Sequence, residues 1–379
     1  MKVTKSLLLG LAALSLAACN KDEETQALHN EKNATVSVVV KSEPKMRLGS
    51  DQDEAKINKL AVMIYNGEAQ EAYKEEKNKA EVENIECSAG TRKLVIVANY
   101  GEKNFRGKTL QELLKTTEEL AKATQEGKNL IMTCEPVSID LKEGKNAYGW
   151  KNKAGYNILS ENPLVIKRVN ARMEFKTINV EMADGFKTVY NVKLKRVAAL
   201  IAKKQSNIFG ASLVNNDPDY LFGIKTPKGS YTPGKYTEET SLVMECPDAN
   251  KNKELNGMGF YVLENNSLQH PTILCVEATL VQADGKDLTE DQKKAAKDAG
   301  WIDDNCNTNY PVLVNWEQDG YTYTTGKGLN KIERNHKYMV TLKITGPGTN
   351  TPEDHKKVAN LDVKCEVAEW IVVNQNVVW

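Results

Sequence analysis

The sequence predicts an all-β protein with two β-sandwich domains and one or two short helices. Three observations lead to this prediction. Short runs in which apolar and polar residues alternate recur along the chain, and each run suits one half-buried strand. Only two stretches carry both a start signal and a stop signal for a helix. The 379 residues are enough for about two domains of ~100–200 residues each, with two sizeable cores.

The beginning of the chain predicts a lipoprotein signal peptide. Lys2 and Lys5 form a basic start, and residues 7–16 form an apolar run that is too short to remain as a membrane span. The run ends in Leu-Ala-Ala-Cys, so small residues precede Cys19 as in a lipobox. We expect residues 1–18 to be removed and the thiol of Cys19 to be acylated. The alternative is an ordinary secretory signal that contains a cysteine.

A polar stretch follows Cys19, and the first predicted strand lies beyond it. Residues 20–32 suit a solvated tether. Residues 34–41 alternate with a period of two, which places four apolar side chains on one face: Ala34, Val36, Val38 and Val40. Pro44 ends this strand. The polar stretch that comes next contains Arg47, the first arginine of the chain, followed by Leu48.

Further strands and two helices are predicted downstream. Residues 107–127 contain the capping box Thr109–Glu112, an apolar stripe and a terminal glycine, which predicts one amphipathic helix. Residues 289–299 predict a second helix for the same reasons. The other apolar or alternating runs predict strands at residues 59–65, 92–99, 164–180, 188–201, 241–246, 259–263, 272–281, 310–316, 338–345 and 361–370.

A change in composition predicts the domain division. Residues 203–240 are rich in Asn, Pro, Gly and Lys, so we expect loops and the connection between domains there. The predicted parts are the signal peptide at 1–18, the tether with the first strand at 19–47, an N-terminal β-sandwich at 48–203 and a C-terminal β-sandwich at 204–379.

The end of the chain is unusually apolar. Residues 370–379 read Trp-Ile-Val-Val-Asn-Gln-Asn-Val-Val-Trp and carry no stop signal. Chain termini are usually polar unless they are tied down, and an exposed apolar strand is an aggregation hazard. We infer that this segment binds to a particular protein surface. Two phases of alternation are open: Ile371, Val373, Val377 and Trp379, which Gln375 interrupts, or Trp370, Val372 and Val378.

No constellation of residues predicts catalysis, a cofactor or a metal site. The four histidines are scattered, and the chain has no zinc-protease, nucleophile-elbow or phosphate-loop motif. The acidic pair Asp303–Asp304 and the pair Asp51 and Asp53 lack the spacing of a calcium loop and suit solvated loops. We therefore predict a protein that is not an enzyme.

Charge, cysteines and aromatic residues narrow the function further. Lys plus Arg and Asp plus Glu both number 51, so no charge excess favours nucleic acid. The six cysteines after Cys19 form no CxxC pair, which argues against zinc. Export would permit disulfides, but Cys275 and Cys365 lie in apolar runs and suit buried thiols. The alternating Trp316, Tyr321 and Tyr323 suit cross-strand packing on a hairpin, with sugar binding as the alternative.

Several segments resemble fimbrillins of the Bacteroidales, the pilins of type V fimbriae. The motif Ile-Glu-Arg-Asn-His-Lys-Tyr at residues 332–338 is one of them. Other matching segments are residues 91–99, 163–174, 310–315, 345–348, 367–370 and the terminal Trp379. Within the family, the resemblance points to the stalk subunit of the minor fimbria of Porphyromonas-type bacteria.

The resemblance implies two transthyretin-like Greek-key β-sandwich domains and a structural role in a fimbria that supports adhesion and colonisation. Family members reach the outer membrane as lipoproteins, and an arginine-specific protease then removes the N-terminal segment with its first strand. The emptied groove accepts a C-terminal strand from the next subunit. In this sequence the cut would fall between Arg47 and Leu48. The donor strand would be residues 371–379, with Ile371, Val372, Val373, Val377, Val378 and Trp379.

The same resemblance implies the partners. They are further copies of the chain in the filament, accessory tip and anchor pilins, an arginine-specific protease, a host or bacterial receptor, and the outer membrane through the lipid of the precursor. Two alternative functions stay open. One is a monomeric surface lipoprotein that binds a glycan or a host protein, and the other is a tip or anchor subunit of the same fimbria.

Overall fold

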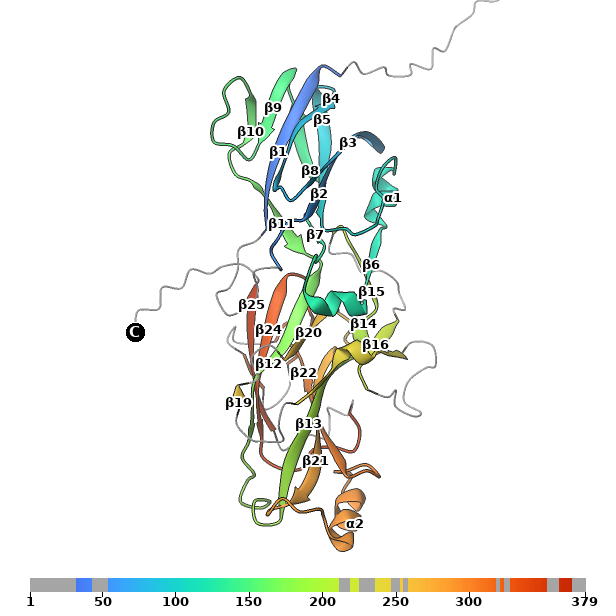
Figure 1. Cartoon of the computed structure of the whole chain (residues 1–379), viewed down its shortest axis with the longest axis vertical. Helices are drawn as coiled ribbons and strands as arrows, with labels where there is room; N and C mark the ends of the chain where they lie inside the picture. Colours follow the sequence, from blue (N-terminus) through green and yellow to red (C-terminus); the bar gives the residue numbers. More distant parts are fainter. Residues whose placement is uncertain are drawn as a thin grey trace, which may run out of the picture. The chain divides into compact units, whose positions relative to one another are not determined.

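The computed structural model describes residues 32–42, 54–210, 219–224, 236–246, 253–254, 258–317, 321–323, 328–352 and 361–369 (Figure 1). Cys19, Arg47, Leu48 and the tail from Trp370 to Trp379 lie outside the described residues. The described part consists mainly of β-strands, with two α-helices and two short 3-10 helices. The prediction of an all-β fold is therefore confirmed.

The first part of the chain forms a ten-stranded sheet. Its order is β10-β9-β1-β11-β7-β5-β2-β3, and β4 also pairs with β1 while β8 pairs with β5. The strands are β1 (Ala34–Ser42), β2 (Lys59–Asn66), β3 (Ala69–Lys77), β4 (Glu81–Cys87), β5 (Gly90–Ala98), β7 (Met132–Thr133), β8 (Val137–Leu141), β9 (Gly144–Tyr148), β10 (Asn157–Ser160) and β11 (Leu164–Arg168).

The strand β2 is buried on both faces. Its even-numbered residues from Leu60 to Ile64 pack in one apolar cluster together with β1. Its odd-numbered residues from Ala61 to Tyr65 pack in the larger apolar cluster on the opposite face. A strand buried on both sides reads as a nearly continuous apolar run. This explains why the sequence of β2 is apolar from Leu60 to Tyr65 without a clean alternation.

The later part of the chain forms three further sheets. The first has the order β19-β12-β24-β25-β23, and β20 also pairs with β12. The second has the order β18-β13-β21-β22, and the third has the order β14-β16-β17. The short strands β6 (Thr117–Glu119) and β15 (Gln205–Asn207) pair with each other. The remaining strands are β12 (Asn170–Val180), β13 (Tyr190–Leu200), β14 (Ala202–Lys203), β16 (Tyr220–Phe222), β17 (Tyr236–Glu238), β18 (Val243–Glu245), β19 (Lys253–Glu254), β20 (Gly259–Leu263), β21 (Ile273–Gln282), β22 (Asn307–Leu313), β23 (Tyr321–Tyr323), β24 (His336–Ile344) and β25 (Leu361–Glu369).

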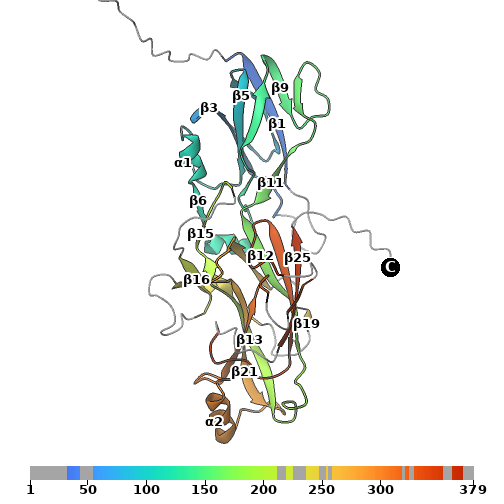
Figure 2. The same cartoon turned by 180° about the vertical axis from the view of Figure 1, so that it is seen from behind.

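The pairing of β12 and β13 differs from the predicted domain division, which placed residues 48–203 in one domain and 204–379 in the other. β12 runs parallel to β24 and antiparallel to β20, and β13 runs antiparallel to β21. Their partners thus come from the later part of the chain. The change of sheet falls at Val169, between β11 and β12, inside the single strand predicted over residues 164–180 (Figure 2). Alternation identifies a strand but does not identify its partner.

The single helix predicted over residues 107–127 is wrong. The chain forms α1 (Leu110–Leu114), then β6, then the 3-10 helix η1 (Lys122–Glu126). The predicted capping box is present, because the backbone N–H of Glu112 donates to Thr109 Oγ1 at 3.2 Å and the backbone N–H of Thr109 donates to Glu112 Oε2 at 2.9 Å. The middle of the segment pairs with β15 instead, and this tertiary pairing overrides the local helix propensity.

The second predicted helix is confirmed. α2 (Glu290–Asp298) begins after Thr289, whose side chain accepts from the N–H of Gln292. Gly300 follows with a φ of 72°, the left-handed conformation that ends many helices. The other 3-10 helix, η2 (Thr240–Leu242), lies just before β18.

The predictions for the two cysteines and for the aromatic hairpin have different outcomes. Cys275 and Cys365 are each 1% exposed and lie in the main core, as predicted for buried thiols. The predicted aromatic hairpin is wrong, because β23, which holds Tyr321 and Tyr323, runs parallel to β25. Trp316 is 6% exposed and belongs to the main core. Its burial favours the packing interpretation over a sugar-binding surface.

Candidate functional site

The strand β1 occupies an interior position in the first sheet. Its residues 34–39 pair antiparallel with β4 on one side, from Ala34 opposite Cys87 to Val39 opposite Glu81. Its residues 34–38 pair parallel with β9 on the other side, and residues 40–42 pair parallel with β11. Figure 1 shows β1 in blue beside β9. Removing β1 would therefore open a gap between strands that it now joins.

The inner face of β1 carries the four apolar residues that the alternation predicts. Ala34, Val36, Val38 and Val40 are each 0–2% exposed. They pack in one cluster with residues of β2, β4, β5, β8 and β11. Burying a valine side chain contributes roughly 1.5–3 kcal/mol, so these contacts hold β1 firmly in place.

Two side chains of β1 make hydrogen bonds to backbone groups. Ser37 Oγ accepts from the backbone N–H of Asn84 at 3.1 Å. Ser42 Oγ donates to the backbone oxygen of Ala55 at 2.9 Å. The backbone pairing uses groups that nearly every residue type offers, whereas these two bonds need a hydroxyl on the strand and a backbone group on its neighbour. A different strand of suitable shape could make most of the same contacts.

The chain beyond residues 43–53 is anchored at Glu54, which is 5% exposed. Glu54 Oε1 accepts from Arg172 Nη1 at 3.1 Å and from the hydroxyl of Tyr261. Its backbone oxygen accepts from Arg168 Nε at 3.1 Å. The chain before segment 43–53 is held in β1, and the chain after it is held by a polar network on β11, β12 and β20. The bond from Ser42 Oγ to the backbone oxygen of Ala55 links these two ends directly.

This polar network contains several buried charges. Arg172 Nε lies 3.0 Å from Glu174 Oε2, and Lys337 Nζ lies 2.9 Å from Glu174 Oε1. Burial alone would lower the pKa of Arg172, but its interactions with Tyr261, Glu174 and Glu54 raise it above the ordinary value. Arg172 therefore stays charged, and each carboxylate has a cation next to it. Removing one partner of such a pair leaves an uncompensated buried charge.

The predicted site residues divide into two groups. The four inward residues of the first strand lie together on β1, as described above. Cys19, Arg47, Leu48 and the donor residues Ile371, Val372, Val373, Val377, Val378 and Trp379 lie outside the described residues. The described chain reaches Glu369, the last residue of β25.

The sequence analysis did not identify Glu54, Arg168 and Arg172 as functional candidates. Their burial depends on partners far away in the chain, so no local pattern reveals it. The sequence does carry one signal of buried charge in this strand, because Arg172 and Glu174 interrupt an apolar run at positions that share one face.

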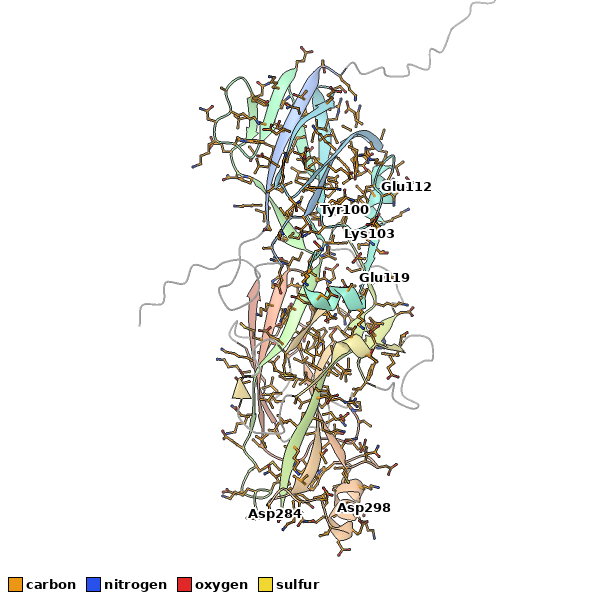
Figure 3. All side chains as sticks on the ribbon, in the orientation of Figure 1. Tyr100, Lys103, Glu112, Glu119, Asp284 and Asp298 are labelled. Atoms are coloured by element: carbon orange, nitrogen blue, oxygen red, sulfur yellow. The ribbon has the colours of Figure 1, made fainter. Side chains whose placement is uncertain are left out.

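The described residues contain no group of three or more His, Cys, Asp or Glu side chains that could hold a metal ion. Within the same residues, no helix is long and apolar enough to span a membrane. A cleft of about 550 Å³ is lined by Tyr100, Lys103, Glu118 and Asn170, among others. Figure 3 labels Tyr100 and Lys103. Lys103 Nζ pairs with Glu118 Oε2 at 2.9 Å, so these two charges compensate each other.

Comparison with known proteins identifies the family. A family model described as FimA4 pilin C-terminal domain matches residues 170–370, and one described as major fimbrial subunit protein (FimA) matches residues 34–206. Over 390 residues the chain is 49% identical to a major fimbrium subunit FimA type-2 of Porphyromonas gingivalis, with 100% of both chains covered. The chain belongs to the FimA pilin family. It is a structural fimbrial subunit of the cell surface, and not an enzyme.

Other FimA proteins and solved structures agree with this membership. A major fimbrium subunit FimA type-4 of P. gingivalis W83 is 44% identical over 395 residues, again with 100% of both chains covered. The crystal structure of a P. gingivalis W83 fimbrilin is 40% identical with a TM-score of 0.81, covering 91% of this chain and 99% of that one. A putative cell adhesion protein of Parabacteroides distasonis is 20% identical with a TM-score of 0.64, which shows a shared fold.

The FimA relatives correct one detail of the sequence analysis. They are named as subunits of the major fimbrium, whereas the resemblance of the sequence segments had pointed to the minor fimbria. Segments such as residues 332–338 therefore identify the fimbrillin family and do not distinguish its subtypes. The family model for the C-terminal domain begins at residue 170, where β12 begins. This start agrees with the change of sheet at Val169.

Proposed function

We propose that this FimA-family chain is the polymerising stalk subunit of a surface fimbria. It is exported as an outer-membrane lipoprotein through Cys19, cut between Arg47 and Leu48, and assembled by donor-strand exchange. The observation that carries the proposal is the position of β1, a nine-residue strand buried inside the sheet and followed closely by Arg47. A single cut after Arg47 would separate this strand from the rest of the chain.

The energetics of β1 support the proposal. Losing three buried valines costs roughly 1.5–3 kcal/mol each, and each lost backbone hydrogen bond costs a further ~0.5–1.5 kcal/mol. The sum is on the order of 10 kcal/mol, comparable with the ~5–15 kcal/mol that stabilise a whole domain. An emptied groove would therefore strongly favour the capture of a replacement strand.

The C-terminal tail suits this replacement. Residues 371–379 match the nine-residue length of β1 and are apolar at both ends. Strand addition supplies backbone hydrogen bonds for affinity and side-chain pockets for register. Because donor and acceptor belong to different parts of the chain, the contact between two copies is heterologous. Contacts of this kind propagate as a filament when they do not close into a ring.

The Glu54 anchor separates the leaving strand from the remaining chain. After a cut at Arg47, residues 48–53 would still be attached to Glu54 and its network with Arg168, Arg172 and Tyr261. The segment 19–47 would then have no covalent link to the rest of the chain, and its described contacts are those of β1 and of Lys32 and Asn33 just before it. The departure of β1 would cost the new N-terminus the bond from Ser42 to Ala55, while the contacts of Glu54 would remain.

The remaining partners follow from the family resemblance. The lipid on Cys19 would hold the precursor at the outer membrane until an arginine-specific protease releases it. Accessory pilins would form the tip and the anchor of the filament. A host or bacterial receptor would bind the assembled fimbria, which thereby supports adhesion and colonisation.

Treatment of the purified precursor with an arginine-specific protease tests the proposal. We expect mass spectrometry to find a chain that starts at Leu48, and a gel of unboiled sample to show a ladder of multimers. The Arg47→Ala variant should remain a full-length monomer. Arg106→Ala is the matched control, because the Arg106 side chain is 58% exposed and should leave both results unchanged. A clean cut that yields only monomers would reject the stalk-subunit proposal.

Truncation of the tail tests the donor strand separately. A chain without residues 374–379 should be cut normally and remain folded, but it should not form a ladder. Normal filaments from this truncation would place the donor elsewhere. A natural chain that keeps its lipid and residues 19–47 on the cell surface would instead favour an anchor subunit, or a monomeric lipoprotein that binds a glycan or host protein.

A further inference from the structure

We propose that residues 149–156, called the strap below, cross the outer face of β1 and select which strand can occupy its groove. This inference rests on the strand-exchange function proposed above. The strap connects the end of β9 to the start of β10, and it contains Trp150, Lys153 and Tyr156. Its contacts, the burial that it produces and the space that it leaves all support this role.

The strap is bonded to the strand on the far side of β1. β9 pairs with one edge of β1, and β4 pairs with the other edge. The strap leaves from the end of β9, yet the ammonium group of Lys153 pairs with the carboxylate of Glu83 on β4. The hydroxyl of Tyr156 also donates to Asn84 Oδ1 on β4, at 3.4 Å. The strap therefore spans β1 from one neighbouring strand to the other.

The contacts on β4 fall opposite the middle of β1. The register between the two strands shifts between Val36 and Val38, so that Glu83 and Asn84 together face Ser37. Asn84 has a φ of 54°, and its backbone N–H donates to Ser37 Oγ. Two residues opposite one form a β-bulge, which turns side chains away from their regular direction. The bulge therefore presents both residues to the strap.

Rings and cations stiffen the strap. The Lys153 ammonium lies 4.2 Å from the ring centroid of Trp150 and 4.7 Å from that of Tyr156. Lys145 of β9 lies 5.6 Å from the centroid of Tyr156. A cation over an aromatic face is attracted by the negative centre of the ring. The Lys153 side chain is only 19% exposed, so it is held between these groups and Glu83.

The strap accounts for the burial at the middle of the outer face of β1. On either side of Ser37, Thr35 and Val39 are half-buried, and Lys41 beyond them is exposed. Ser37 points away from the apolar core, yet it is 0% exposed. Ala147, its partner on β9, is also 0% exposed. On a sheet with one uncovered face, such outward residues would contact water.

The strap leaves little space above β1. Gly149, its first residue, has a φ of 98°, and a Cβ atom there would lie 3.0 Å from Val39 Cβ and 3.1 Å from Pro163 Cα. The backbone of the strap thus passes close to the outer side of Val39. A strand with large outward side chains at the positions of Ser37 and Val39 would have to displace the strap.

This selection favours one phase of the C-terminal tail. One phase would place Ile371 and Trp379 inward and the asparagines Asn374 and Asn376 outward. The other would place Gln375 and Trp379 outward, under the strap or at its edge. The first phase turns Val372, Asn374, Asn376 and Val378 outward and Gln375 inward, so no aromatic side chain faces the strap. We therefore expect the tail to enter with Asn374 and Asn376 facing the strap.

Peptide exchange tests the strap. A precursor without residues 374–379 is cut at Arg47 and mixed with labelled peptides of residues 32–42, and uptake is followed by fluorescence. The cut protein should take up the natural peptide and a Ser37→Ala peptide, but take up a Ser37→Phe peptide at least about tenfold less. The Lys153→Ala/Tyr156→Ala variant should exchange the natural peptide about 5- to 30-fold faster, because this factor corresponds to one or two kcal/mol. The variant should also discriminate less between the natural and the Ser37→Phe peptides.

The test has a control variant, and different outcomes would overturn the strap, the strand exchange and the assigned phase of the tail. Lys142→Ala is the matched control, because Lys142 pairs with Asp140 at an exposed position outside the strap. Equal uptake of the natural and Ser37→Phe peptides by the unaltered protein, or unchanged exchange in the double variant, would overturn the strap while strand exchange stands. If no peptide of residues 32–42 or 370–379 enters, the strand-exchange function fails and the strap fails with it. Uptake of an Asn376→Trp tail peptide at the natural rate would overturn the assigned phase.

Discussion

Two interior strands, β1 and β12, both pack apolar side chains in a core, but they differ in their polar contacts. β1 contributes valines to an apolar cluster, and its serines bond to backbone groups. β12 contributes Met173 and Phe175 to the main core, and it adds Arg172 and Glu174 in buried ion pairs with Glu54 and Lys337. Contacts of the first kind can be reproduced by another apolar strand, whereas the ion pairs require particular partners. This difference agrees with the proposal that β1 is released from the subunit on maturation and that β12 remains in it.

The largest expected effect breaks the network on β12. Arg172→Ala would leave Glu54 and Glu174 buried with fewer positive partners, so we expect the free energy of unfolding to fall by about 3–5 kcal/mol. Urea denaturation of the precursor measures this change. Lys297→Ala, which removes an exposed pair with Asp304, is the control and should change stability by less than about 1 kcal/mol. A similarly small loss for Arg172→Ala would contradict the assignment of β12 as the permanently anchored strand.

The second prediction compares the precursor with the filament. Val38→Ala removes two buried methyl groups from β1, so the precursor should lose about 2 kcal/mol of stability. Filaments from the same variant should be as stable as unaltered filaments, because β1 is absent from them. Thermal unfolding of both samples gives the comparison. Equal destabilisation of precursor and filament would mean that β1 remains in the assembled subunit.

The third prediction concerns the space above β1. Gly149 and Gly144 both have a positive φ, but a Cβ at Gly144 would meet nothing within 4 Å. Gly144→Ala should therefore lose only about 1–2 kcal/mol for its backbone conformation. Gly149→Ala should lose about 1–2 kcal/mol more, because the added carbon crowds Val39 and Pro163. Equal losses in urea denaturation would show that the strap yields easily and leaves more room than the geometry indicates.

The smallest expected effect is a dependence of peptide exchange on pH. The hydrogen bond and charge of Lys153, followed by the charges of Lys79 and Lys74, hold the pKa of Glu83 below its ordinary value. A lowered carboxyl pKa stabilises the strap above the ordinary value of about 4.3, and this contribution is lost as the pH falls through the lowered value. Exchange should therefore accelerate about two- to fivefold in acid, consistent with one exposed ion pair. In Glu83→Gln this acceleration should be absent, and an unchanged pH profile would exclude Glu83 as the cause.

Local patterns in the sequence predicted much of the fold. The period of two in residues 34–41 identified β1 and its inner face, and Thr289 with Gly300 located α2. Two features escaped because they depend on distant partners: β12 and β13 joined strands from the later part of the chain, and β6 replaced a predicted helix by pairing with β15. The strand β3 escaped for a different reason, because it pairs with the adjacent β2 but is polar and shows no apolar alternation.

The candidate site was predictable only in part. The apolar residues of β1 have a pattern that can be read locally, whereas the buried Glu54 has none. The strap escaped as well, because its function depends on Lys153 and Tyr156 reaching Glu83 and Asn84 on a strand about 70 residues earlier in the chain. Polar residues in a loop usually indicate a solvated surface, and only their contacts reveal that they cover β1.

The intact mass of subunits in filaments purified from cells tests strand exchange most directly. We predict a chain that begins at Leu48 and lacks residues 34–42, with the tail through Trp379 still present. Filaments whose subunits retain Val36, Val38 and Val40 would contradict the exchange of β1 for a neighbour's strand.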